Sequence, residues 1–367
     1  MKKKSAPPAE ITNYSQWKLI RMRFLRHKLA VVSLVMLCLF YLVAIFADFI
    51  IPHPPNEHDR TAIFAPPTRI HFRDENGFSF RPFVHPVTHS RNPHTLAMEF
   101  EFDTSQRDYI QFFVRGHVYR LFGLFETDRH LFGTRDGTRI HLFGANGMGK
   151  DVFSATIYGS RISLTIGLVA IFISLTLGIL IGSVAGYFGG LIDNLIQRFI
   201  EILRSIPSLP LWMVLSAAIP PNWSMVNRYL AITIILSFMG WTDMARVVRG
   251  KFLSLRDEDY ITAARLSGVN EWGIITRHLV PSFSGYIITA ATLSVPGMIL
   301  SETALSFLGL GMQSPAVSWG VLLQDGQNVF ALAHAPWLLI PGLFVIVTVL
   351  LFNFLGDGLR DAIDPYS

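Results

Sequence analysis

Residues 164–184 read LTIGLVAIFISLTLGILIGSV, a run that contains no charged side chain. A helix of about 20 apolar residues is long enough to cross the ~30 Å hydrocarbon core of a bilayer. Residues 186–190 follow as Gly-Tyr-Phe-Gly-Gly, a turn-rich string that favours a tight reversal at a membrane boundary. This stretch therefore predicts a transmembrane helix and sets the class of the whole chain.

The composition of the chain agrees with a membrane protein. Of 367 residues, 51% are hydrophobic and only 16% are charged, which is too apolar for an ordinary soluble domain. The formal net charge is +5, but the basic residues lie beside apolar runs and form no stripe interleaved with aromatics, so a nucleic-acid partner is not expected. The single cysteine, Cys38, excludes an internal disulfide and a cysteine-based metal site.

Five further stretches are apolar enough to be spans. The first is too long for the ~7–15-residue apolar region of a signal peptide and has no small-residue cleavage site after it, so it is expected to be retained. The third contains Pro207 and Pro210, which are expected to kink it. The chain is thus predicted to be an all-α integral membrane protein with six transmembrane helices. They are residues 29–51, 164–184, 196–219, 229–240, 286–310 and 337–355.

The distribution of Lys and Arg predicts the orientation. The first 28 residues contain one acid, Glu10, among many basic residues, and short basic segments stay in the cytoplasm. Residues 246–281 are also basic and fall on the same side, so both termini are expected to be cytoplasmic. The basic residues of the first segment are Lys2, Lys3, Lys4, Lys18, Arg21, Arg23, Arg26 and Lys28.

These expectations divide the chain into five parts. A cytoplasmic N-terminal segment, 1–28, precedes the first transmembrane helix, 29–51. Residues 52–160 form an extracytoplasmic insert, whose alternating aromatic and apolar residues at 112–125 predict short strands and turns in a small mixed fold. A five-helix core, 161–355, contains the cytoplasmic loop 246–281, and residues 356–367 form a cytoplasmic tail.

The cytoplasmic loop has an ordered pattern of its own. Asp257, Glu258 and Asp259 favour the N-terminus of a helix through its macrodipole. Ala263 and Ala264 give that helix a small, smooth face, and Gly268 allows a sharp turn after it. Pro281 is then expected to start the next transmembrane helix, so the loop is predicted to be helix, break, helix.

This loop resembles the "EAA loop" of permease subunits of ABC importers, because Ala263, Ala264, Gly268 and Pro281 fall at matching positions. The sequence departs from the pattern at Thr262, where the family has glutamate, and at His278, where an aliphatic residue is usual. The resemblance implies a coupling helix at about 257–267 that docks on an ATPase and transmits its movement. The coupling residues it implies are Tyr260, Thr262, Ala263, Ala264, Arg265, Gly268 and Pro281.

Further stretches are similar to the dipeptide, oligopeptide and nickel class of these permeases. They are residues 149–164, 205–208, 302–311, 318–320 and 356–365. The resemblance implies a type I ABC importer permease in a bacterial inner membrane, with no covalent chemistry and no cofactor of its own. Its partners would be a homologous second permease subunit, two ATPase subunits or domains that carry ATP and Mg, an extracytoplasmic solute-binding protein, and membrane lipid.

The substrate implied by the resemblance is a short peptide, with oligosaccharides, opines or nickel as alternatives. A secondary transporter driven by an ion gradient is a rival reading, but it would need no coupling loop. A membrane-anchored receptor is another, but it predicts one or two spans. Candidates for the translocation pathway or for helix packing are Pro207, Pro210, Glu302 and Ser306.

Two patterns imitate other sites. Residues 144–150 spell G-x-x-x-x-G-K, the start of a phosphate-binding loop, but Asp151 replaces the Ser or Thr that would bind magnesium, and its carboxylate would repel phosphate. Nine of the twelve histidines lie in the insert, yet only the loose series His85, His89 and His94 approaches metal-ligand spacing. Neither an ATP site nor a metal site is therefore expected in this chain.

Two charged groups leave alternatives open. Glu302 lies inside an apolar span, where a charge costs roughly 3 kcal/mol. A hydrogen bond to Ser301, Thr303 or Ser306 is favoured over a proton-carrying role, and the outer end of the span could also bring it to water. The charges after the last span form either a solvated tail or a contact with the ATPase; they are Asp357, Arg360, Asp361 and Asp364.

Overall fold

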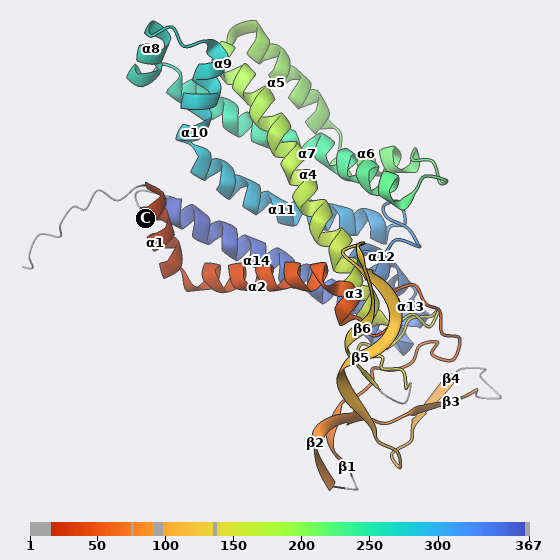
Figure 1. Cartoon of the computed structure of the whole chain (residues 1–367). Coiled ribbons are helices and arrows are strands. Elements are labelled where there is room, and N and C mark those ends of the chain that lie inside the picture. The colour runs from red at the N-terminus through yellow and green to blue at the C-terminus, as the bar shows by residue number, and fades with distance from the viewer. Residues whose placement is uncertain (1–15, 75–76, 92–97, 135–137, 364–367) are drawn as a thin grey trace, which may run out of the picture.

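Long helices form a bundle with a β-rich insert at one end (Figure 1). The computed structural model describes residues 16–74, 77–91, 98–134 and 138–363. The predictions made for Lys2, Lys3, Lys4, Glu10, His94 and Asp364 lie outside the described residues.

Five described helices are long and apolar enough to cross a membrane, and a sixth span results if one bent pair counts as a crossing. The five are α2 (Lys28–Ile45), α4 (Val152–Phe188), α7 (Met225–Leu255), α11 (Ser284–Phe307) and α14 (Ile340–Ile363), which continues from η3 (Pro336–Leu339). The bent pair is α5 (Gly190–Ser205) and α6 (Ser208–Ala217).

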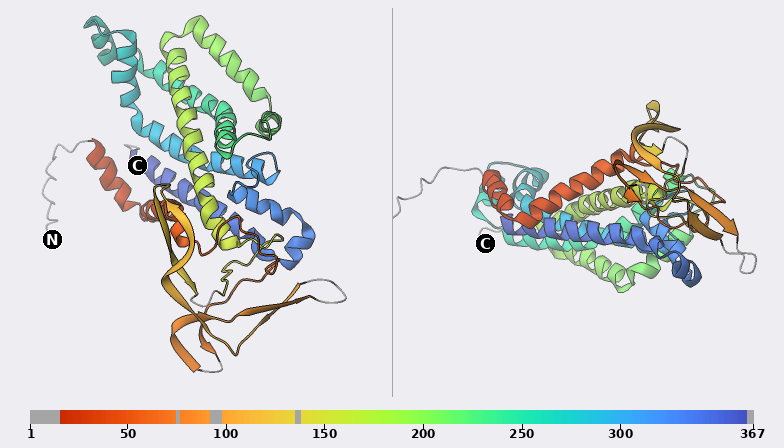
Figure 2. Two further views of the ribbon diagram at one scale, coloured as in Figure 1. Left: turned by 45° about the vertical axis from the view of Figure 1, so that its right-hand side comes forward. Right: turned by 90° about the horizontal axis from the view of Figure 1, so that it is seen from below.

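The path of the chain makes this pair one broken crossing. Figure 1 shows α5 beginning beside the end of α4 near α8 (Asp259–Leu266), whereas α7 begins at the opposite end of the bundle. The short helix α1 (Gln16–Arg26) and the end of α14 lie toward the same end as α8, and the strands lie at the other (Figures 1 and 2). Six crossings account for this arrangement.

The third span bends far more than a proline kink. Its two helices meet at 81° around Ile206 and Pro207, so the kink predicted within 196–219 is a break between two separate helices. Pro207 has no N–H to donate and disfavours helical geometry in the residue before it, and Ile206 is extended with ψ 124°. Pro210 lies in the first turn of α6, where a missing N–H costs little.

Three helices continue beyond the apolar stretches that predicted them. The second begins at Val152, because the Asp151 carboxylate accepts a hydrogen bond from the Ser154 N–H at 2.7 Å and caps it. The fourth runs on to Leu255 within the loop, and the last runs on to Ile363. Hydropathy marks only the part of a helix that meets lipid, so these polar extensions carry no such signal.

Close packing of α4 on α7 depends on three glycines one turn apart. A Cβ atom on Gly178, Gly182 or Gly186 would lie 2.5 Å from an atom of α7. Small residues at this spacing allow two membrane helices to approach backbone to backbone. At the α8 end of this contact, Arg249 forms two hydrogen bonds with the Asp193 carboxylate, at 2.5 and 2.6 Å, and joins α7 to α5.

The insert contains strands and turns, as predicted, and the strands pair antiparallel. They are not all short, because the longest has 14 residues. One sheet has the order β1-β2-β5-β6, and β3 pairs with β4 in a separate hairpin. In the first sheet, β5 and β6 pair from Ile110 with Thr134 to Leu121 with Phe125. The strands are β1 (His71–Asp74), β2 (Gly77–Val84), β3 (Val87–Arg91), β4 (Met98–Phe102), β5 (Asp108–Leu121) and β6 (Phe125–Thr134).

The G-x-x-x-x-G-K string anchors the insert to the helices. Gly144 lies under the Trp337 indole, where a Cβ atom would come within 2.6 Å of its Nε1. Gly149 has φ +73°, and a Cβ atom there would lie 1.8 Å from the Asp59 carbonyl oxygen. Lys150 donates a hydrogen bond to Asn56 at 3.3 Å. These residues form a tight turn at the junction of insert and helices.

Candidate functional site

The short helix α8 falls within the range predicted for the coupling helix and ends in a left-handed glycine. Gly268 has φ +78°, the Gly268 N–H donates to the Arg265 carbonyl at 3.0 Å, and the Val269 N–H donates to the Ala264 carbonyl at 3.2 Å. These two bonds form a Schellman motif, which satisfies carbonyls at the helix end and needs a residue without strain at positive φ. The predicted break at Gly268 is thus a specific turn.

The chain returns from this turn through two further helical pieces. They are α9 (Glu271–Gly273) and the π-helix η1 (Ile274–Leu279), followed by α10 (Val280–Ser282) and the start of α11 at Ser284. Pro281 lies in α10, two residues before the cap of the long helix, so it precedes the span that it was expected to start.

One face of α8 is packed into the protein. Ile261 is fully buried and Ala264 is 9% exposed, and both belong to an apolar cluster with residues of α7, η1 and α11. Members of this cluster include Val248, Phe252, Ile274 and Phe283. The packing fixes the position of α8 relative to the ends of two long helices.

The opposite face of this region is exposed and contains large apolar side chains. Leu266 is 86% exposed, Trp272 is 53% exposed and Tyr260 is 43% exposed. Thr262 and Ala263 are also exposed. We call Tyr260, Thr262, Ala263, Leu266 and Trp272 the coupling face. Of the two alanines in the motif, Ala263 faces outward and Ala264 faces inward, so only the first is available to a partner.

Arg265 links α8 to the end of α4. Its guanidinium donates a hydrogen bond to the Tyr187 hydroxyl at 3.5 Å, and its Cζ atom lies 6.0 Å from the centre of the Tyr187 ring. The hydrogen bond to Tyr187 raises the pKa of Arg265 above its ordinary value. Arg265 is therefore a permanent cation that connects the coupling face to the helix that carries the insert.

A hollow of about 510 Å³ opens beside the broken span, between α5–α6, α7 and α11. Pro207 lines it, together with hydroxyl-bearing residues such as Ser208, Thr242, Ser294 and Ser301. Arg204 and Asp243, which form an ion pair between α5 and α7, also line it. The other pathway candidates, Pro210, Glu302 and Ser306, are not among its lining residues.

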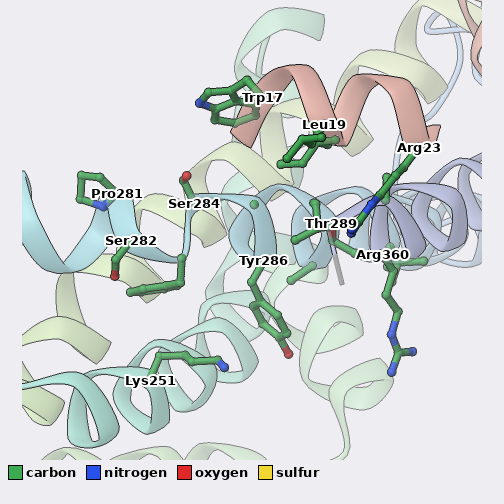
Figure 3. A pocket seen from close by; sticks show the side chains of 17 residues that line it. Trp17, Leu19, Arg23, Lys251, Pro281, Ser282, Ser284, Tyr286, Thr289 and Arg360 are labelled. Carbon is green, nitrogen blue, oxygen red and sulfur yellow. The ribbon is translucent and has the colours of Figure 1, made fainter. Parts of the chain in front are cut away.

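A second hollow, of about 930 Å³, lies toward the α8 end of the bundle (Figure 3). Its described lining includes the cations Arg23, Lys251 and Arg360 and no carboxylate. The Lys251 ammonium lies 5.6 Å from the centre of the Tyr286 ring. Ala290 lines both hollows, which therefore follow one another along α11.

Glu302 is completely buried and is held by two hydroxyl groups. The Ser306 hydroxyl donates to Oε1 at 2.7 Å and the Ser318 hydroxyl donates to the same oxygen at 2.8 Å. The prediction of a serine partner is confirmed for Ser306. It is wrong for Ser301, whose hydroxyl donates to the Gly297 carbonyl, and for Thr303, whose hydroxyl has no partner. The alternative that the outer end of the span brings Glu302 to bulk water is wrong, because Glu302 is 0% exposed.

Ser318 belongs to a segment that folds back into the bundle before α12 (Trp319–Gln324). The Trp319 side chain is fully buried, its indole N–H donates to the Thr156 carbonyl at 3.0 Å, and its backbone N–H donates to Ser163 at 3.0 Å. Glu302 thus fastens α11 to this segment, and Trp319 fastens the segment to α4. These contacts make Glu302 a packing residue.

Comparison with known proteins decides the family. Residues 178–366, more than half of the chain, match the family model described as "Binding-protein-dependent transport system inner membrane component". The chain belongs to this family. Residues 15–67 of the permease also match the N-terminal TM domain of oligopeptide transport permease C.

Curated relatives of the permease are similar over most of their length. It is 43% identical over 226 residues to the oligopeptide transport system permease protein OppC of Haemophilus influenzae, covering 61% of this chain and 70% of that protein. It is 41% identical over 225 residues to the dipeptide transport system permease protein DppC of Bacillus subtilis, covering 61% and 68%. It is a transporter component with several apolar helices, which agrees with a multi-pass inner-membrane protein.

Among solved structures, the permease resembles a chain of the MetNI methionine ABC transporter in an inward-facing conformation. The two are 19% identical, with a TM-score of 0.45 over 58% of this chain and 97% of that one. Because this likeness is weak, family membership rests on the sequence matches. The two family models leave residues 68–177 unmatched, a range that holds the six described strands of the permease.

Two features of the permease were not found from its sequence. The glycine series on α4 could have been found from its four-residue spacing in an apolar run, which is the signal for close helix contact. Ser318 and Trp319 were noticed only as part of a motif, and no local pattern links them to Glu302. Among the described residues, no group of three metal-binding side chains comes together, and His85 instead contacts the Gln106 carbonyl at 2.8 Å.

Proposed function

We propose that this permease forms half of the translocation pathway of an ATP-driven, binding-protein-dependent importer of short peptides. The observation that carries the proposal is the coupling face: a short helix held rigidly from behind by buried Ile261 and Ala264 presents exposed apolar side chains on its other side. Exposing this apolar face to water costs free energy, and burial against a protein partner would remove that cost. In a family of importers without covalent chemistry, that partner is an ATPase subunit.

In this proposal the α8 end of the bundle is cytoplasmic and the insert is extracytoplasmic. The basic side chains of α1, together with Lys251 and Arg360, gather toward the α8 end, as expected for the cytoplasmic side of a bacterial membrane. Both chain termini then belong to the cytoplasm. ATP and Mg are bound by the partner ATPases, and this chain has no ATP site of its own.

The pathway in this proposal follows the two hollows along α11. A homologous second permease subunit would close the open side of α7 and α11 and so complete a channel. The Ser301 hydroxyl donates to the Gly297 carbonyl, so its oxygen offers an acceptor to a peptide N–H, and Ser208 adds a second hydroxyl to the lining. Short peptides are favoured because the curated relatives are named oligopeptide and dipeptide permeases.

The coupling face is tested by Leu266→Glu and Ala263→Arg in the complex co-purified from membranes and reconstituted in vesicles. Both changes place a charge on the face that would be buried against the ATPase, so ATP-dependent uptake of labelled di- and tripeptides should fall by an order of magnitude or more. The matched control is Val329→Glu, because Val329 is 81% exposed and lies in α13 (Val329–His334) at the other end of the molecule.

Retention of the ATPase during purification distinguishes the causes of a loss. A loss of uptake together with a loss of bound ATPase supports docking on the coupling face. Full uptake in both variants would show that the coupling face takes no part in energy coupling. Intact coupling with uptake of sugars instead of peptides would overturn only the substrate assignment.

A further inference from the structure

The hairpin made by β5 and β6 reaches beyond the insert and touches the end of the first transmembrane helix. The Phe122 ring, in the hairpin turn, lies 5.6 Å from the Phe46 ring, and the Phe113 ring lies 6.0 Å from the Phe49 ring, centre to centre. Phe46 directly follows α2, and Phe49 belongs to α3 (Ala47–Ile50). The hairpin is therefore fixed at the level where the first span ends.

This level is the boundary between hydrocarbon and headgroups. The apolar helix α2 has 18 residues, about 27 Å at 1.5 Å per residue, so its length is slightly less than the ~30 Å core and its end lies close to the edge of that core. Just beyond it, Arg161 forms an ion pair with Asp48 at 2.8 Å and donates to the carbonyls of Ala44 and Ile45 at 2.7 and 2.9 Å. Such a charged cluster belongs in the headgroup layer.

The side chains around the hairpin turn are unusually apolar for a loop exposed to water. Leu124 is 76% exposed, Phe125 is 66% exposed and Phe122 is 54% exposed, and Phe122 also has φ +55°, a conformation costly for a bulky residue. Directly behind the turn, Arg120 and Glu126 form an ion pair at 2.8 Å across the strands. The hairpin thus has an apolar tip followed by a charged collar.

The apolar tip continues a surface that already faces lipid. Along α2, exposed apolar side chains lead up to the contact with Phe122: Leu39, Leu42, Ile45 and Phe46, at 38–51% exposure. Phe and Leu side chains on the apolar face of an interfacial segment bury at the boundary between headgroups and acyl chains. The hairpin therefore has apolar side chains at its tip and a charged pair behind them, beside the lipid-facing side of α2. This order matches the order of hydrocarbon and headgroups at the boundary of a bilayer.

We propose that the tip of the β5–β6 hairpin, residues 122–125, inserts into the outer boundary of the membrane and binds phospholipid. Phe122, Leu124 and Phe125 would lie among the first acyl carbons beneath the headgroups. The ion pair of Arg120 and Glu126 would remain among the headgroups. The tip then holds the insert to the membrane at a third point, in addition to its two chain connections. This inference concerns the insert and does not depend on which solute is transported.

Because the chain contains one cysteine, Cys38, replacing it gives a background in which a single introduced cysteine can be labelled. In a Cys38→Ser background, Leu124→Cys is labelled with an environment-sensitive fluorophore and the complete transporter is reconstituted in vesicles. The matched control is Phe80→Cys, because Phe80 is 92% exposed and lies in β2, away from the helices (Figure 1). Quenching is measured with phospholipids that carry a nitroxide near the headgroup and, separately, with iodide in the outer solution.

The probe at Leu124 should be quenched strongly by nitroxide lipid and weakly by iodide, and the probe at Phe80 should show the reverse. Strong iodide quenching at both positions would place the tip in water and overturn the proposal. Protection from both quenchers at Leu124 would mean that a protein surface covers the tip, which would also overturn it. Phe125→Cys is a second reporter, and peptide uptake by each labelled protein shows that it is folded.

Discussion

At the scale of single residues, the buried carboxyl group of Glu302 holds two separate segments together. One of its oxygens accepts hydrogen bonds from Ser306 on the same helix and from Ser318, sixteen residues away in sequence, whereas the other has no partner. A buried hydroxyl that loses its acceptor pays the full cost of desolvation. Substitution of Glu302 should therefore change the stability of the protein more than its transport activity.

Glu302→Ala should lower the free energy of unfolding by about 1–3 kcal/mol, because both serine hydroxyls lose their acceptor. Glu302→Gln retains a carbonyl oxygen and should cost much less. Thermal unfolding of the purified complex in detergent measures both. The dependence of uptake on pH should be the same in Glu302→Gln and in the native protein; if the substitution abolishes that dependence, the residue carries protons.

Sequence alone anticipated part of this site. A carboxylate in an apolar span needs a partner, and Ser306 lies one helical turn from Glu302, so that pair could be predicted from helix geometry. Ser318 could not, because its position depends on a loop that folds back before α12. The direction of the two alanines in the coupling motif was also unknown until the packing of Ile261 showed which side of α8 is buried.

At the scale of elements, the contact between α4 and α7 sets how the bundle is assembled. Gly182 lies in the middle of the glycine series, and a Cβ atom on it would lie 2.5 Å from the Ala245 carbonyl oxygen, a backbone atom that cannot move alone. Membrane helices gain little from the hydrophobic effect when they associate, so close backbone contact provides much of the stability.

Gly182→Ala should therefore destabilise the permease by about 1–3 kcal/mol, the usual cost of overpacking. Gly250 gives the matched control on α7, since a Cβ atom there meets nothing within 4 Å. Gly250→Ala should be neutral or stabilise by about 0.5–1 kcal/mol through helix propensity. The two variants are compared by melting temperature in the same detergent. Equal melting temperatures would show that α4 can shift on α7 without cost.

The existence of the long helices could be predicted from composition and length, but their ends could not. Asp151 caps α4 thirteen residues before the apolar run begins, and this single side chain is the local signal for the start of the helix. The 81° break at Pro207 was underestimated because a proline in lipid can be accommodated by a mild kink or by a change of direction, and tertiary packing decides between them.

At the scale of the whole molecule, the proposed pathway follows the two hollows that share Ala290. Gly297 lines the outer of the two hollows, and a Cβ atom there meets no atom within 4 Å. A small reporter at this position should fit without distorting α11. It should report whether solvent reaches the hollow from one side of the membrane or from both.

In the Cys38→Ser background, Gly297→Cys should react with a membrane-impermeant cationic thiol reagent, and the reaction should stop peptide uptake. Excess peptide together with ATP should slow the reaction. Ile346→Cys is the control, because Ile346 is 56% exposed on α14 and lines neither hollow. Equal reaction rates at both positions, unaffected by peptide, would show that the pathway lies elsewhere.

The number of crossings and the location of the insert follow from the order of apolar stretches along the chain. The course of the pathway does not, because it depends on which helix faces remain uncovered after packing. The fold of the insert was predicted only as strands and turns. Its contact with α2 through Phe122 and Phe46 joins residues that are far apart in sequence.

Helix α4 is a single piece of 37 residues, about 55 Å long at 1.5 Å per residue, that joins the insert at Asp151 to the Gly189 turn near α8. Such a rod acts as a lever. A tilt of about 5° would move its far end by about 5 Å over that length. In the orientation proposed above, a movement of α8 against the ATPase would be carried along α4 to the insert on the outer face of the membrane.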